Sequence, residues 1–140
     1  MDVEAAGHRD AIRALVARLN MAGDRARFAE LAACFTEDGV LSWASGEGRG
    51  RAAIARNVVT ERAAPIAFVR HHLTVFDIAL ADDFASATGR IRFYVMADAG
   101  PDHAGIYLDS YVRAGDEWLI ARRDIEIEWQ APTSLFPRQL

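Results

Sequence analysis

The sequence predicts an α+β fold, in which amino-terminal helices pack on a strongly curved, mostly antiparallel sheet that encloses an internal pocket. Apolar residues recur at three- and four-residue spacing through residues 3–63, whereas long strand-like segments joined by short turns fill residues 68–129. This segregation favours helices that cover one face of an antiparallel sheet over alternating β-α-β units. A length of 140 residues fits a single domain, residues 1–140.

The first predicted helix runs from Val3 to Met21, and its apolar positions share one face: Ala11, Ile12, Leu15, Val16 and Leu19. Gly23 suits a left-handed helix end, and Asp24 is expected to cap the amino terminus of a short second helix. Residues 36–39 then turn the chain into a brief strand at residues 40–43, and glycine-rich residues 46–50 lead to a third helix from Arg51 to Ala63.

Pro65 favours extended backbone, and four strands are expected after it, over residues 68–80, 84–97, 105–113 and 117–129. Gly89 and Gly105 lie inside these strands, at places where bulges would bend the sheet. A curved sheet covered by helices leaves an interior pocket lined by inward-pointing side chains.

Composition excludes several classes of protein. The net charge is −4, which argues against a nucleic-acid partner, and no apolar run reaches the roughly 18 residues that span a membrane. All sixteen basic residues are Arg, which excludes Schiff-base chemistry and a P-loop because both need a Lys. The amphipathic amino terminus has no signal-peptide pattern, so we expect a cytoplasmic protein. The lone Cys34 sits where a small buried apolar residue is wanted.

Four ordered segments carry a resemblance to a known family: residues 23–40, 48–54, 70–74 and 115–123. In this order and at these separations they resemble the SnoaL-like family of the nuclear transport factor two-like superfamily, over roughly Ala11 to Trp129. The resemblance implies a cone-shaped α+β barrel with a ligand pocket. It does not select one activity, since this scaffold serves isomerases, dehydratases, cyclases, dehydrochlorinases, oxygenase small subunits and binding modules.

Asp24 and His71 occupy the places of a catalytic pair in the subgroup that contains bile-acid 7α-dehydratase and hexachlorocyclohexane dehydrochlorinase. A carboxylate bonded to one imidazole nitrogen fixes the tautomer, and the other nitrogen then acts as a general base. A helix cap at Asp24 and a packed core histidine at His71 are the competing interpretations. His72 falls on the opposite face of its strand, unless a bulge exchanges the two histidines.

The same resemblance places Arg123 where the dehydrochlorinase has an arginine that assists leaving-group departure, so Arg123 is the third catalytic candidate. The subgroup's acid, a Tyr or Lys five residues before the catalytic Asp, is replaced by Leu19. The other residues expected to contact substrate are Trp43, Tyr94, Tyr107, Leu19 and His72. No metal site is expected, because His8 lies on the first helix, His103 lies near a turn, and no paired ligand spacing occurs.

These features predict a lyase or isomerase that needs no cofactor and acts on a small hydrophobic molecule. A non-catalytic binding or association module is the second hypothesis, and an oxygenase small subunit is the third. We also expect a homo-oligomer, a dimer or a trimer, formed through an outer sheet face that carries Phe76, Ile78 and Tyr111.

Overall fold

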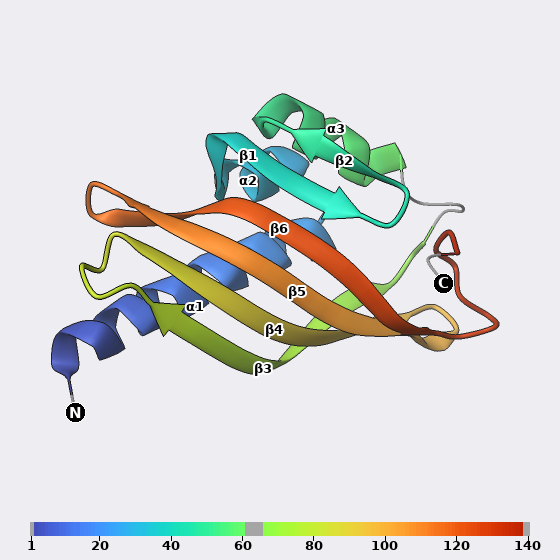
Figure 1. Ribbon diagram of the computed structural model, residues 1–140. Coiled ribbons are helices and arrows are strands. Elements are labelled where there is room, and N and C mark those ends of the chain that lie inside the picture. The colour runs from blue at the N-terminus through green and yellow to red at the C-terminus, as the bar shows by residue number, and fades with distance from the viewer. Residues whose placement is uncertain (1, 61–65, 139–140) are drawn as a thin grey trace.

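The computed structural model describes residues 2–60 and 66–138 and confirms the α+β class (Figure 1). Six strands form one sheet in the order β2-β1-β6-β5-β4-β3, which curves strongly but does not close. Only β1 and β6 pair in parallel, so the sheet is mostly antiparallel as predicted. The elements are α1 (Val3–Asp24), α2 (Phe28–Ala33), β1 (Phe35–Trp43), β2 (Gly46–Arg49), α3 (Arg51–Thr60), β3 (Val69–Leu80), β4 (Ser86–Ala97), β5 (Gly100–Ala114) and β6 (Glu117–Gln130).

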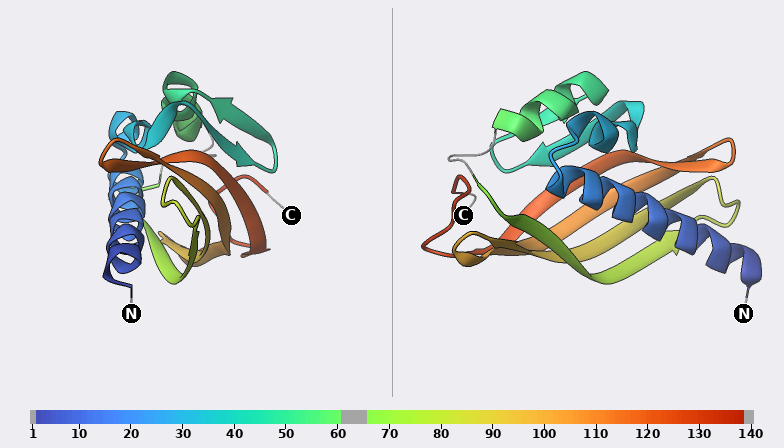
Figure 2. Two further views of the ribbon diagram at one scale, coloured as in Figure 1. Left: turned by 60° about the vertical axis from the view of Figure 1, so that its left-hand side comes forward. Right: turned by 180° about the vertical axis from the view of Figure 1, so that it is seen from behind.

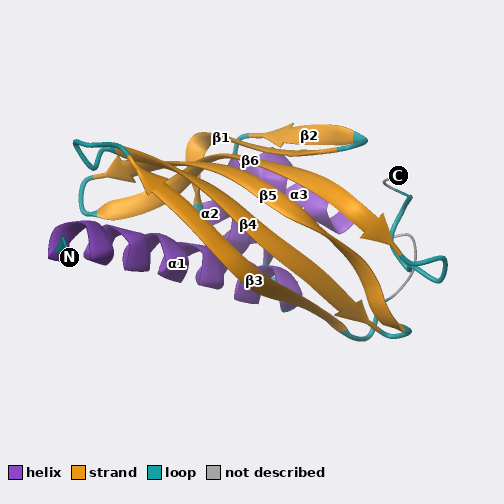
Figure 3. Cartoon of the chain, turned by 60° about the horizontal axis from the view of Figure 1, so that its bottom comes forward, coloured by secondary structure: helices purple, strands orange, loops and turns teal. Residues whose placement is uncertain are grey.

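Helix α1 lies along one face of the long strands, and the sheet curves on the side that this helix covers (Figures 2 and 3). Four of the five positions in the predicted apolar stripe, Ile12, Leu15, Val16 and Leu19, face the sheet and are almost fully buried, whereas Ala11 is exposed. Burial of such side chains stabilises a fold by about 1.5–3 kcal/mol each. The stripe therefore fixes the position of α1, and with it the position of the helix's last residue, Asp24.

The junction between α1 and α2 differs from the prediction. Helix α1 continues to Asp24, and α2 begins after Arg27 with no side-chain cap, so the expected capping role of Asp24 is wrong. The backbone N–H of Arg27 donates to Ala22 O at 2.9 Å, and that of Ala26 donates to Gly23 O at 3.1 Å. This is the Schellman pattern, with Ala26 rather than a glycine in the left-handed conformation, at φ 57°. The turn leaves the Asp24 carboxylate free to point at the sheet.

The segment after α2 holds more strand than the sequence indicates. Residues 36–39, expected as a turn, lie inside β1, and most of the glycine-rich segment forms β2. Helix α3 begins at Arg51 as predicted, while its expected end at Ala63 and the extended backbone at Pro65 fall outside the described residues. Strand β5 begins at Gly100, five residues before the predicted start. Pairing with β4 and β6 extends it beyond its own apolar pattern.

A bulge in β3 determines which side chains face the interior. The pairing with β4 shifts between Leu73 and Val75, so odd-numbered residues face inward before the bulge and even-numbered residues after it. As a result Ile78 is buried and Phe76 packs on the core, while Val75 is 48% exposed. Tyr111 is also buried, on the inward face of β5. The expected outer face of Phe76, Ile78 and Tyr111 is therefore wrong.

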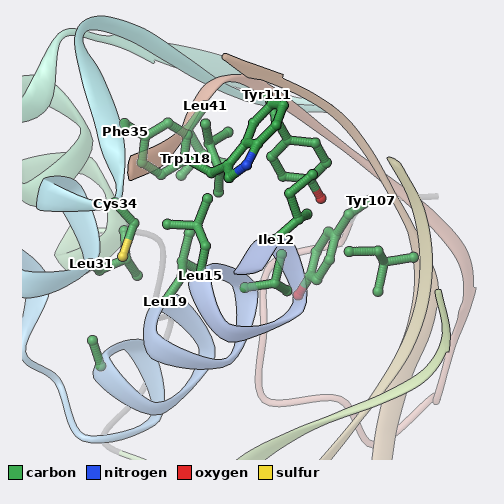
Figure 4. Close-up of a cluster of buried hydrophobic side chains, with 14 of the residues drawn as sticks. Ile12, Leu15, Leu19, Leu31, Cys34, Phe35, Leu41, Tyr107, Tyr111 and Trp118 are labelled. Carbon is green, nitrogen blue, oxygen red and sulfur yellow. The ribbon is translucent and has the colours of Figure 1, made fainter. Parts of the chain in front are cut away.

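The core fills the space between α1 and the sheet (Figure 4). Cys34 is buried in it, as predicted, and its Sγ lies 3.6 Å from the carbonyl oxygen of Glu30. Burial raises the pKa of this thiol above its ordinary value. Gly89 lets the Tyr111 side chain pack directly against the backbone of β4, since a Cβ at this position would lie 2.7 Å from the Tyr111 hydroxyl oxygen. Gly105 lies at a register shift in the pairing of β5 with β6, as expected for a bulge.

Candidate functional site

A cavity of about 190 Å³ opens between the end of α1, the inward face of the sheet and the segment that follows β6. Most of its surface is apolar, contributed by side chains such as Leu19, Phe93 and Ile125. The polar side chains that reach it are few, which is the usual composition of a small-molecule site. They are Asn20, Asn57, His71, His103, Tyr107, Arg123 and Gln130.

Asp24 and His71 meet at the edge of this cavity. Nδ1 of His71 lies 2.6 Å from Oδ1 of Asp24, and the backbone N–H of His71 donates to the two carboxylate oxygens at 3.1 and 3.2 Å. The carboxylate accepts these bonds, so Nδ1 carries the proton and Nε2 is the ring nitrogen left for a ligand. Asn20 Nδ2 donates to the carbonyl oxygen of His71 at 3.1 Å. The last turn of α1 therefore holds both the ring and the backbone of His71.

A second carboxylate and imidazole pair, Asp102 and His103, was missed in the sequence, and its imidazole lines the same cavity. Nδ1 of His103 lies 2.7 Å from Oδ1 of Asp102, and both residues are buried. The hydroxyl of Ser134 and the backbone N–H of Leu135 also donate to Asp102, at 2.6 and 2.8 Å. The segment after β6 thus folds back onto β5, and Phe136 contacts the His103 ring edge-on at 4.8 Å between centroids.

Burial and hydrogen bonding act in opposite directions on this second pair. Burial would raise the pKa of Asp102, but the bonds from Ser134, His103 and Leu135 outweigh it, so the pKa lies below its ordinary value. Burial lowers the pKa of His103, and the bond and charge of Asp102 offset this only in part. The charge of His71 lowers it further. At neutral pH the pair is therefore a carboxylate and a neutral imidazole with Nε2 unprotonated.

Arg123 reaches the cavity from β6, but it is already paired. Its Nε and Nη2 donate to the two carboxylate oxygens of Asp109 at 2.7 Å each, and the Tyr111 hydroxyl donates to Asp109 at 2.6 Å. Its guanidinium carbon lies 4.0 Å from the centroid of the Tyr107 ring. Burial would lower the pKa of Arg123, but Asp109 outweighs it and raises the pKa, so the side chain stays charged.

Of the eight predicted site residues, five line the cavity, Asp24 bonds to one of these five, and two lie on the other face of the sheet. The five that line the cavity are Leu19, Trp43, His71, Tyr107 and Arg123. Burial raises the pKa of Tyr107, so its phenol stays protonated, and Figure 4 shows its hydroxyl directed towards α1. Nε1 of Trp43 is buried without a hydrogen-bond partner in the described part of the chain.

His72 and Tyr94 do not line the cavity. Their rings stack on each other at 4.8 Å between centroids, and Tyr94 is 40% exposed. Strand alternation places them on the outward face, because the β3 bulge comes after His72 and does not exchange it with His71. The substrate contact expected of these two side chains therefore has no geometric support.

Sequence reasoning set His103 aside because it lies near a turn. The available signal was its parity: His103 shares the alternation of Gly105, Tyr107 and Asp109, so a strand that began earlier would point it inward.

Among the described residues no group of three or more metal-binding side chains comes together, and no described helix is long and apolar enough to cross a membrane.

Comparison with known proteins identifies relatives of this arrangement. The family model described as a SnoaL-like domain matches residues 4–124. Similar solved structures include a proposed scytalone dehydratase from Novosphingobium aromaticivorans, with 20% identity, a TM-score of 0.82, and 94% of this chain and 91% of that chain covered. A structure from Catenulispora acidiphila shares 28% identity, with a TM-score of 0.78 and 89% and 94% covered. LinA shares 18% identity, with a TM-score of 0.78 and 98% of both chains covered. No curated protein matches.

Proposed function

Because this chain belongs to the SnoaL-like domain family, we propose that it is a cofactor-independent lyase or isomerase that acts on a small hydrophobic molecule. The observation that carries the proposal is the 2.6 Å contact between Asp24 and Nδ1 of His71 at the edge of an apolar cavity. A buried carboxylate that orients a partly exposed imidazole is the arrangement that general-base catalysis needs. The name of the N. aromaticivorans relative, a proposed dehydratase, agrees with this reaction class.

In the proposed reaction Nε2 of His71 removes a proton from a carbon next to a carbonyl group. The electron pair of the broken C–H bond moves towards the carbonyl oxygen, and Asp24 stabilises the imidazolium that forms. If a leaving group stands on the next carbon, the electrons return to expel it and a double bond forms. Otherwise the proton returns at another carbon and the product is an isomer. The dry walls of the cavity protect the anionic intermediate from solvent.

The size of the cavity limits the substrate. About 190 Å³ is close to the ~150 Å³ of a cavity that holds one benzene ring. The apolar walls contact such a ring, while His71, Tyr107 and Arg123 supply polar contacts at its edge. We therefore infer a substrate with one ring and an adjacent carbonyl, rather than a fused polycyclic compound.

The imidazole tautomer tests the pair without a known substrate. In ¹⁵N-histidine NMR spectra, neutral His71 should carry its proton on Nδ1, and Asp24→Asn should shift the population towards Nε2–H. Asp98→Asn is the matched control, because Asp98 bonds the backbone of Ala67 and Phe68 just before β3 and touches no imidazole. An unchanged His71 tautomer in Asp24→Asn would contradict the proposed base.

A binding module remains the second candidate, for a specific reason. Arg123 is paired with Asp109 through Nε and Nη2, and Leu19 stands where the related enzymes have an acid. A cavity whose arginine is already neutralised by a carboxylate is suited to holding an apolar ligand unchanged. Isothermal titration with single-ring ketones, followed by product analysis, separates the two candidates, because a binding module would take up the ketone and return it intact.

A further inference from the structure

We propose that Asp102 and His103 form the second proton-transfer pair of this cavity, in which Nε2 of His103 protonates the group that departs while His71 removes the proton. The inference rests on the proposed function, because it supplies the acid that a lyase needs and that Leu19 does not provide. It assigns to His103 a direct contact with the substrate.

The sheet places the two imidazoles in one row. His71 on β3 pairs with Val95 on β4, and Val95 pairs with His103 on β5. Side chains in one row of a sheet point to the same face, and adjacent strands lie about 4.8 Å apart, so the two Cα atoms lie about 10 Å apart. The Phe93 ring lies between the imidazoles, with centroids 6.3 Å from His71 and 6.1 Å from His103. One small ring over Phe93 and Val95 would therefore reach both.

The carboxylate of Asp102 is built to orient His103. It accepts hydrogen bonds from Ser134, Leu135 and His103, all between 2.6 and 2.8 Å. Its low pKa keeps it ionised, so the His103 proton stays on Nδ1 and Nε2 is the nitrogen that gains and loses a second proton. In both pairs a carboxylate therefore binds Nδ1 of an imidazole and leaves Nε2 for the substrate. The first carboxylate is held at the end of α1, and the second is held by the segment after β6.

The charges around His103 favour exchange of one proton between the two rings. Among the described residues, the ionisable side chains that line the cavity besides His103 are His71 from β3, Tyr107 from β5 and Arg123 from β6, while Gln130 and Phe136 are neutral. Behind the two imidazoles, Asp24 bonds to His71 and Asp102 bonds to His103. Of these, His71 acts on His103 directly, and its positive charge favours the neutral form of His103. When His71 takes a proton from the substrate, its new charge therefore promotes release of the proton from His103.

The proposed step is balanced. His103 is mostly neutral at neutral pH, so the active form is the fraction of molecules in which Nε2 of His103 has gained a proton from solvent and Nε2 of His71 carries none. His71 takes the proton next to the carbonyl group, the C–H electron pair forms the new double bond, and the bond to a β-hydroxyl oxygen breaks. The oxygen leaves with both bonding electrons and takes the proton of His103, so water departs. His71 then returns its proton to solvent and His103 regains one, which restores the starting form.

A titration experiment tests the coupling without a substrate. With ¹⁵N-labelled histidine, His71→Gln should raise the titration midpoint of His103 by about 0.3 to 1.2 pH units, as expected for unit charges about 10 Å apart at dielectric constants of about 80 and 20. His72→Gln is the matched control, since His72 is the next residue but lies on the outer face. An unshifted His103 midpoint in His71→Gln, or an equal shift in the control, would overturn the inference.

A pair of leaving groups separates this inference from the proposed function. The probes are 3-hydroxycyclohexanone, which must lose a protonated hydroxyl, and 3-acetoxycyclohexanone, which loses acetate without an acid; enone absorbance reports turnover. His103→Gln should lower turnover of the hydroxy ketone at least 100-fold and that of the acetoxy ketone less than 5-fold. Equal losses on both would overturn the role of His103. Full activity of His71→Gln on both would refute the proposed base instead. If the wild-type chain turns over neither, the titration alone decides.

Discussion

The buried ion pair of Arg123 and Asp109 allows a quantitative prediction. Both side chains are at most 3% exposed, and the pair makes two 2.7 Å bonds with a third from Tyr111. Asp109→Asn keeps the shape but leaves a buried guanidinium without its counter-charge, and an arginine side chain does not escape this cost by losing its proton at ordinary pH. Breaking a buried pair from one side costs about 3–5 kcal/mol. A domain with a total stability of about 5–15 kcal/mol would then lie close to unfolding.

Urea unfolding, followed by fluorescence of the three tryptophans, measures this cost. The control is Asp124→Asn, which breaks the bidentate pair with Arg122 at the surface, where the side chains are 36% and 41% exposed. We expect the control to lose at most about 1 kcal/mol. The double substitution Asp109→Leu with Arg123→Met should recover most of the loss, because it removes both charges. A loss at Asp109→Asn no larger than in the control would refute the reasoning.

Three further predictions concern stability and reactivity. Ala26→Gly should raise the free energy of unfolding by about 0.5–1 kcal/mol in urea titrations, because glycine adopts the left-handed conformation of Ala26 without strain; a loss of stability would contradict the assigned helix end. Cys34 should resist a thiol-reactive disulfide reagent in the native protein and react fully in urea, because burial raises its pKa; rapid native labelling would count against its burial. His103 has a pKa below about 6.5, its value in an unfolded chain, so the unfolded state binds more protons and stability should fall as pH drops below 6.5. His103→Gln should flatten this slope in thermal melts, and an unchanged slope would show that His103 does not cause it.

Most of the architecture was predictable because it depends on patterns local to each element. The helical stripe from Ile12 to Leu19 and the alternation in the four long strands each specify a type of structure and a buried face. Helices followed by a meander then leave few ways to cover the sheet. Local pattern was insufficient at residues 36–39, which resemble a turn. The strand β6 pairs with Phe35 before them and with Val40 after them, so they lie within β1 at a register shift.

The candidate site was predictable only in part. Asp24 and His71 were found through the resemblance, and the structure places them 2.6 Å apart. The pairing of Arg123 was not predictable, since its partner Asp109 comes from a different strand and from the register of β5 with β6. Asp102 and His103 escaped notice because their position depends on a segment that folds back after the last strand. Such long-range contacts leave no periodic signal.

The carboxylate of Asp102 links the His103 ring to the segment that follows β6. One oxygen accepts from both His103 and Ser134, and the other accepts from Leu135. A proton gained by His103 strengthens its hydrogen bond to Oδ1 of Asp102, the oxygen that also accepts from Ser134. Ser134 begins the segment in which Phe136 and Pro137 form one wall of the cavity. By thermodynamic linkage, any preference of that wall for one charge state of the imidazole is matched by an equal effect of the wall on the imidazole's proton affinity. The position of this wall and the charge of the His103 ring are thus coupled through one carboxylate.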